Sequence, residues 1–368
     1  MKKSIAISLI AAAIAAGSSN ISAQQTKVLT AEKLNDYGLV YSLPVTALEI
    51  TVTAEKKTLI AGPYAKYAKK YLATDKIISE NAEIWTIKDV YVRPYGAVDT
   101  DTKYLMQLKP GATTFIGVDQ NGMILSINRE PEDLRINAPS YRPSEINPSP
   151  QRPNGKEYLQ FVDEDFIASQ SSAKQAEMLG SAIMEVRDAR LSLTRGTADT
   201  MPTDGKQLEL MLNSLAEQEE AMTAAFTGSE YTEIVSRTYT FVPEEDGEST
   251  LFRFSDFKGF CAANDYAGSP FRIRVNVTSE GSLPSDPNGK EKEMPKDAIR
   301  YAIPGAAQIT LSHDNQTYFN KEMEFAQMGV VFGLNPALFT DKKAPAYAVF
   351  SPVTGGIIEL ATLPSQSR

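Results

Sequence analysis

Apolar residues along this chain recur at two different spacings. Stretches rich in Val, Ile, Thr and aromatic residues, with partial alternation, lie on both sides of a central region of helical spacing. The predicted strands are residues 45–53, 83–94, 103–108, 112–117, 123–128, 230–243, 250–258, 270–278, 299–312, part of 316–332, and 345–360. An Asn-Gly pair at 121–122 favours a hairpin. The pattern predicts an α+β fold, mainly antiparallel β-sheet units with an inserted helical hairpin.

Two central segments carry apolar residues at helical spacing. They are Ala176, Leu179, Ile183 and Val186 within residues 171–195, and then Leu208, Met211, Leu212, Leu215, Met222 and Phe226. Thr203 or Asp204 can cap the second helix, and Gly228 can follow its end. We therefore expect two antiparallel helices whose apolar faces pack together or onto a sheet.

Two charged residues, Arg190 and Glu219, lie on or near these apolar stripes. In a hairpin that turns near residue 200, Arg190 faces residue 209 or 210, and Glu219 faces Ser181. At a rise of 1.5 Å per residue the two charges are then about 13 Å apart. The sequence therefore predicts no ion pair between them.

The order of these patterns divides the chain into five segments. Between the first β region and the helices, residues 129–155 hold six prolines in a polar stretch that can form neither a helix nor a central strand. The predicted segments are a signal peptide (1–23), an N-terminal β-rich unit with one short helix (24–128), a Pro-rich linker or arm (129–155), the helical hairpin region (156–228) and a C-terminal β-rich unit (229–368).

The first 23 residues have the pattern of an export signal. Lys2 and Lys3 precede an uncharged apolar run over 5–16, and small residues follow, so we expect cleavage between Ala23 and Gln24. A run of twelve residues is too short for a membrane anchor, which needs about 20. We expect an exported protein with no transmembrane segment in the mature chain; periplasm and cell surface both remain open.

A short helix predicted after Gly62 places three tyrosines on one face. Pro63 suits the first helical position, and Tyr64, Tyr67 and Tyr71 follow at i, i+3 and i+7. Such a stripe can be a ligand surface on which sugars stack. The alternative is that the rings belong to the core with their hydroxyls at its rim, which is the commoner arrangement.

One phrase occurs twice in the chain. "YSLPVTALEITVT" begins at Tyr41 and "YAIPGAAQITLS" at Tyr301, and with one gap five positions are identical. A second echo joins "FIGVDQNGMILSI" from Phe115 to "FSPVTGGIIEL" from Phe350, each turning through Gly. Two related β units would explain both echoes. The alternative is that strands that begin near Pro and hairpins that turn on Gly are common.

Charge and motif content remove several function classes. The formal charge is −9, and −11 once the two leader lysines are lost, which does not fit a nucleic-acid partner. The single cysteine, Cys261, allows no internal disulfide and reads as a buried thiol. The single histidine, His313, reads as a turn residue and supports neither a zinc site nor a catalytic triad. We expect no cofactor, no metal and no catalytic residue.

Four separated motifs resemble one family. "YSLPVTALEITVTAEK" with "GPYAKYAKKYL", the central "RGTADTMPTDGKQLELMLNSLAEQEEAMTAAFTG", "YAIPGAA" and "FSPVTGGIIEL" are similar to a family of uncharacterised exported proteins (a domain of unknown function) from Bacteroidetes. The resemblance implies an exported protein and carries no activity or site. In such a host it also implies that "DTM", residues 199–201, is a short sequon that makes Thr200 a candidate for O-glycosylation.

Together these patterns favour a non-enzymatic envelope protein that acts as a binding or structural scaffold. Its partner would be another envelope protein or a glycan. The alternative is a carbohydrate-binding or carbohydrate-cleaving protein, which exposed aromatic side chains beside paired carboxylates would favour.

Overall fold

The computed structural model describes residues 38–107, 115–130, 152–295, 297–341 and 344–363. These residues form three antiparallel sheets and a set of helices, which confirms the predicted α+β fold. The first sheet has the strand order β2 (Ala82–Gln107), β1 (Gly38–Ile60), β5 (Ser229–Phe241). The second has the order β10 (Gln316–Leu334), β9 (Ile299–His313), β8 (Ser269–Ser279), β6 (Gly247–Ser255), β7 (Gly259–Cys261). The third has the order β12 (Ile357–Thr362), β11 (Ala346–Phe350), β4 (Ile124–Ile127), β3 (Ile116–Val118).

The helices lie between the two β regions of the sequence, apart from a first short pair and a late 3-10 turn. The longest are α3 (Ser172–Arg195) and α4 (Gly205–Thr227), within two residues of the predicted bounds. The shorter ones are η1 (Ala65–Tyr67), α1 (Ala68–Leu72), η2 (Glu157–Phe161), α2 (Glu164–Ala168) and η3 (Pro336–Phe339). Part of the predicted Pro-rich linker, residues 131–151, lies outside the described residues.

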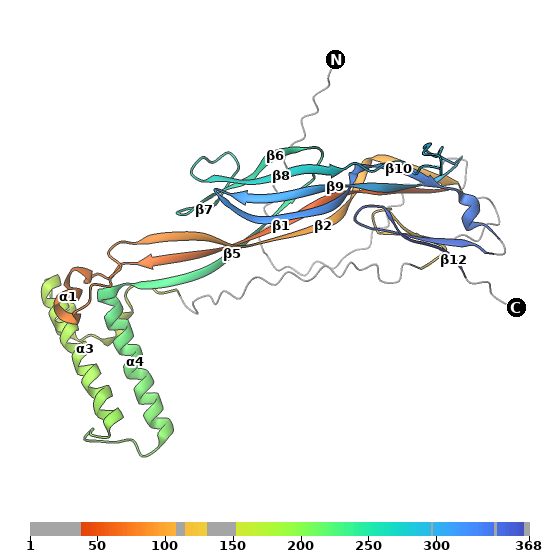
Figure 1. Ribbon diagram of the computed structural model, residues 1–368. Helices are drawn as coiled ribbons and strands as arrows, with labels where there is room; N and C mark the ends of the chain where they lie inside the picture. Colours follow the sequence, from red (N-terminus) through yellow and green to blue (C-terminus); the bar gives the residue numbers. More distant parts are fainter. Residues whose placement is uncertain (1–37, 108–114, 131–151, 296, 342–343, 364–368) are drawn as a thin grey trace.

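The molecule is elongated, with helices at one end and the third sheet at the other (Figure 1). At about 3.3 Å per residue, the 23 residues of β1 span about 75 Å of this length. The hairpin of α3 and α4 projects away from the strands (Figure 1). The molecule is therefore a β rod with a helical arm.

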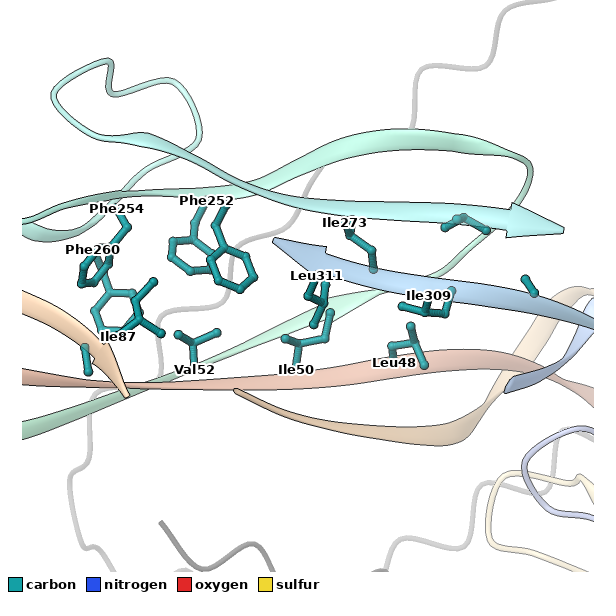
Figure 2. Packing of buried hydrophobic residues seen from close by; sticks show 14 of the residues in the cluster. Leu48, Ile50, Val52, Ile87, Phe252, Phe254, Phe260, Ile273, Ile309 and Leu311 are labelled. Carbon is teal, nitrogen blue, oxygen red and sulfur yellow. The ribbon is translucent and has the colours of Figure 1, made fainter. Parts of the chain in front are cut away.

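The middle of the rod is a core between the first two sheets. Leu48, Ile50 and Val52 point from β1 toward residues of β6, β8 and β9 (Figure 2), and all three are fully buried. Phe252 stacks on Phe271 with the ring centroids 4.6 Å apart. The alternation along β1 thus turns one face of the first sheet toward the second sheet.

Both copies of the repeated phrase contain the same irregularity in their strand pairing. β1 pairs with β2, and β9 with β10, and in each pair one partner strand has extra residues opposite the phrase. The pairs that flank the bulge are Ser42–Lys103 and Pro44–Val98 in the first unit, and Ile303–Val330 and Gly305–Phe325 in the second. The predicted strands 83–94 and 103–108 are therefore one bulged strand, β2.

The Gly hairpins dock on the two phrases in the same way. The Ser42 N–H donates to the carbonyl of Gly122 at 3.0 Å, and the Ala302 N–H donates to Gly355 at 3.1 Å. Both glycines have positive φ, which glycine adopts without strain. The two phrases also meet, because the Tyr41 hydroxyl accepts the Arg300 N–H at 2.7 Å. Each half therefore repeats one construction, a long bulged hairpin with a short hairpin docked on it.

The second bulge joins the two units. The Gln327 side chain accepts the Thr46 N–H at 2.9 Å and donates to the carbonyls of Thr46 and Pro243. The Thr46 hydroxyl in turn donates to the Val353 carbonyl at 2.9 Å and accepts the Ala326 N–H. This junction satisfies backbone groups that a bulge leaves without ladder partners.

The single cysteine and the single histidine of the chain are both buried. Cys261 is 7% exposed, which confirms the predicted buried thiol. His313 ends β9 and is 8% exposed, so the prediction of a turn residue is wrong. Its ring stacks on Phe271 at 6.2 Å, and the turn itself begins at Asp314. The period-two pattern of β9 ends one residue later than the polar residues suggested.

Candidate binding surface on the helical hairpin

The base of the helical arm has its own hydrophobic core. Tyr64, Tyr158 and Phe166 come from η1 and its flank, from η2 and from α2, and pack with Leu179, Ile183, Met222 and Phe226 of the long helices. The Tyr64 and Tyr158 rings meet edge to face at 5.8 Å. This core fixes the arm to the end of the rod.

The three tyrosines named as a candidate ligand surface, for which the core was the alternative, lie in and beside this core. Tyr64 is 5% exposed and its hydroxyl donates to Gln175 at 3.2 Å. Burial raises the pKa of its phenol well above the ordinary value. Tyr67 and Tyr71 are half-buried, and Tyr71 packs on Gly180, where an added Cβ would be 3.0 Å from it. Tyr64 is thus part of the core, and only Tyr67 and Tyr71 reach the surface.

The arm extends well beyond this core. A helix of 24 residues such as α3 is about 36 Å long. The Ser171 hydroxyl accepts the Lys174 N–H at the start of α3, and Gly196, with φ of 70°, ends it. Asp204 precedes α4 without a side-chain cap, and Gly228 ends it as predicted.

A groove runs between α3 and α4 in the outer half of the arm. Its volume is about 610 Å³, and Leu193, Met211 and Leu215 are its apolar members. Small and polar residues make up the rest: Ala189, Ser192, Thr197, Ala198, Asp199, Thr200, Ser214 and Gln218. Small side chains on a helix face allow another segment to approach closely.

The inner half of the same face is covered by the chain itself. Gln175 lies two heptads before Ala189, hence on the same side of α3. Its side-chain amide donates to the carbonyls of Phe166 and Ser169, at 3.3 and 2.9 Å. The α2 segment therefore occupies the inner part of the face whose outer part is the open groove.

The apolar residues of α4 are buried near the base of the arm and exposed farther out. Met222 and Phe226, near the base, are at most 1% exposed. Farther out, Met211 is 39% exposed, and Leu210, one turn before Ser214 and so beside the groove, is 62% exposed. The sequence predicted Met211 as core and did not single out Leu210. The one sequence signal for this exposed surface was the length of the apolar stripe on α4, which is longer than the short helices η2 and α2 can cover.

An ion-pair cluster ties α3 to α4, and the prediction of none is wrong. Glu219 Oε2 lies 2.6 Å from an Arg190 nitrogen, and its Oε1 lies 2.7 Å from Arg187 Nε. The loop between the helices is centred on residue 200, as assumed, since α3 ends at 195 and α4 begins at 205. The bonds of Glu219 to Arg187 and Arg190 show that the two helices are nevertheless offset along their axes. This offset shortens the axial separation, and the long arginine side chains reach across the rest.

The other predicted site residues are placed as follows. Thr200 is exposed in the loop between the long helices and lines the outer end of the groove. Ala23 and Gln24 lie outside the described residues. Within the described ranges, no three His, Cys, Asp or Glu side chains lie close enough together to hold a metal ion. No helix in that same part of the chain is long and apolar enough to cross a membrane.

The comparison with protein families decides where this chain belongs. The domain of unknown function DUF4831 matches residues 37–358, which includes both β units and the arm. The chain belongs to the DUF4831 family. No curated protein and no solved structure matches it. Membership of DUF4831 therefore names the domain without giving it an activity.

Proposed function

We propose that this DUF4831 protein is an exported, non-enzymatic scaffold whose helical arm binds another component of the cell envelope. The observation that carries the proposal is the open outer groove on the arm, with Leu193, Met211 and Leu215 inside it and Leu210 beside it. Export rests on the leader pattern of residues 1–23, and O-glycosylation of Thr200 remains part of the proposal.

The shape of the molecule supports a binding role. A two-helix arm that projects from a rod leaves apolar positions facing solvent, and unpartnered apolar surface of this kind marks interaction sites. The alternative of a carbohydrate-binding surface at Tyr64, Tyr67 and Tyr71 has less support, because Tyr64 is in the core and the other two are half-buried.

Site-specific photo-crosslinking in intact cells tests the proposal. A photoreactive amino acid at Leu210, beside the groove, is compared with one at Leu191, which is 44% exposed and does not line the groove. We expect a discrete crosslinked product from position 210 and none from position 191, with the partner's residue identified by mass spectrometry. Absence of a product at both positions, or equal products at both, contradicts the proposal.

A further inference from the structure

The outer groove of the arm is open, and none of the described segments of the chain fills it. The inner half of this face already holds α2, through the bonds of Gln175 to Phe166 and Ser169. In the outer half, nothing among the described residues fills the roughly 610 Å³ beside Leu193, Met211 and Leu215. Whatever binds in this groove must therefore be one of the segments that the structure does not describe, or another chain.

Chain length argues against a segment of the same molecule. β1 starts at the far end of the rod and spans about 75 Å. After cleavage at Ala23, residues 24–37 reach at most about 50 Å from Gly38. Residues 131–151 reach at most about 75 Å and must already connect β4 to Arg152, which lies beside Ile60 at the helical end. Neither segment has length to spare for the arm.

A second copy of the arm fits the groove, because the arm carries both an exposed leucine and a groove lined by small residues. Leu210 is a protruding apolar side chain, and Ser214, one turn later, belongs to the wall of the open groove together with Ala189 and Ser192. If two copies of α4 pack antiparallel so that Leu210 meets Ser214 of the second copy, each protruding leucine enters the other copy's groove. Both contacts form together, as a two-fold axis requires.

Charge supports the same register. Pairing of Leu210 with Ser214 brings Lys206 close to Glu217 of the second copy, twice per dimer, because paired positions in an antiparallel arrangement have a constant sum. Both side chains are exposed in the single chain. They therefore form opposite-charge contacts at the rim, which favour this orientation.

We infer that two copies of this chain associate through their helical arms, as an antiparallel pair in which Leu210 of each copy enters the groove of the other. The outer faces are about 25 Å long and 20 Å wide, so the dimer buries about 1,000 Å² in total, at the lower limit for specific interfaces. We expect a dissociation constant of about 1–100 µM. This inference rests on the proposed function, since it names the occupant of the same groove.

Sedimentation velocity of the purified mature chain between about 1 and 200 µM measures the association. We expect a monomer–dimer equilibrium that Leu210→Glu weakens at least tenfold. The matched control is Leu191→Glu, at a similarly apolar exposed position outside the groove, which leaves the equilibrium unchanged. A chain that stays monomeric at 200 µM, or equal weakening by both variants, overturns the inference.

A charge exchange tests the register. We expect Lys206→Glu and Glu217→Lys each to weaken the dimer about threefold at low salt, and the double variant to restore it. Failure of the double variant to recover contradicts the antiparallel register. A monomeric purified chain that still gives a crosslink from position 210 to a different protein in cells overturns the self-association and leaves the proposed function standing.

Discussion

At the residue scale, two tyrosines couple the fold to pH. Burial raises the pKa of Tyr41 to about 12, and it raises the pKa of Tyr239 to about 12 as well, from an ordinary value of 10.0. Tyr41 is 2% exposed and its hydroxyl bonds to the backbone of Arg300. The phenol must therefore stay neutral while this contact between the two repeated phrases is intact.

The sign of the effect follows from linkage. A phenol whose folded pKa is raised contributes its stability in full below pH 10 and loses it as the pH rises toward 12. We expect the urea midpoint to fall between pH 10 and 12, with a cost from Tyr41 of up to about 3 kcal/mol. Exposed tyrosines ionise first, and the additional tyrosinate absorbance near 295 nm from the buried phenols should appear together with unfolding.

Two variants separate this effect from general alkaline destabilisation. Tyr41→Phe lowers stability at neutral pH, because it leaves the Arg300 N–H without its acceptor, but it flattens the loss between pH 10 and 12. Tyr266→Phe, on a ring that is 83% exposed, leaves unchanged both the stability at neutral pH and its loss between pH 10 and 12. An equally steep loss in the Tyr41→Phe variant contradicts this account.

At the element scale, the two helices depend on the ion-pair cluster as well as on their apolar stripes. Glu219, with 14% of its side chain exposed, is shared by Arg187 and Arg190. We expect Glu219→Ala to lower the free energy of unfolding by about 1–2 kcal/mol, discounted because both arginines are partly exposed. Helical circular dichroism during urea unfolding measures it.

The neighbouring residue supplies the control. Glu220 is exposed and carries the same charge, so Glu220→Ala should change stability by less than about 0.5 kcal/mol. If the two variants have the same effect, the cluster contributes nothing beyond net charge.

The same scale shows what the sequence could predict. The bounds of α3 and α4 follow from the 3.6-residue pattern and the glycines 196 and 228, which act locally. β1 is longer than the predicted 45–53, and in the added part Lys56 and Lys57 form ion pairs with Glu83 and Glu230, which lie diagonally across from them in the neighbouring strands. A single sequence does not show cross-strand partners, so charged residues inside a strand look like its end.

The candidate site was hidden for a related reason. The stripe that contains Met211 and Leu215 reads as core along its whole length, and only the tertiary structure shows that α2 and η2 cover just the inner half. In the repeated phrase the local pattern was sufficient, because Pro and Gly at matching positions do correspond to matching bulges and turns.

At the scale of the whole molecule, the β rod and the helical arm differ in how completely they are packed. The junction at Thr46 and Gln327 holds the two β units together, and the rod carries a helical arm at one end (Figure 1). The arm's base is fixed by its own core, whereas its outer half has less cover. The rod and the base of the arm therefore hold the packed cores, and the outer arm, for which we propose binding, is where we expect concentration-dependent behaviour.

Hydrogen–deuterium exchange of the purified mature chain at about 0.5 and 200 µM tests this assignment most directly. We expect amides in residues 189–218 to exchange about two- to tenfold more slowly at the high concentration, depending on where the dissociation constant lies between about 1 and 100 µM, while the strands of the rod are unchanged. The Leu210→Glu variant should show a clearly smaller difference between the two concentrations. Exchange of residues 189–218 that is the same at both concentrations, or protection that appears instead on the rod, would contradict the account.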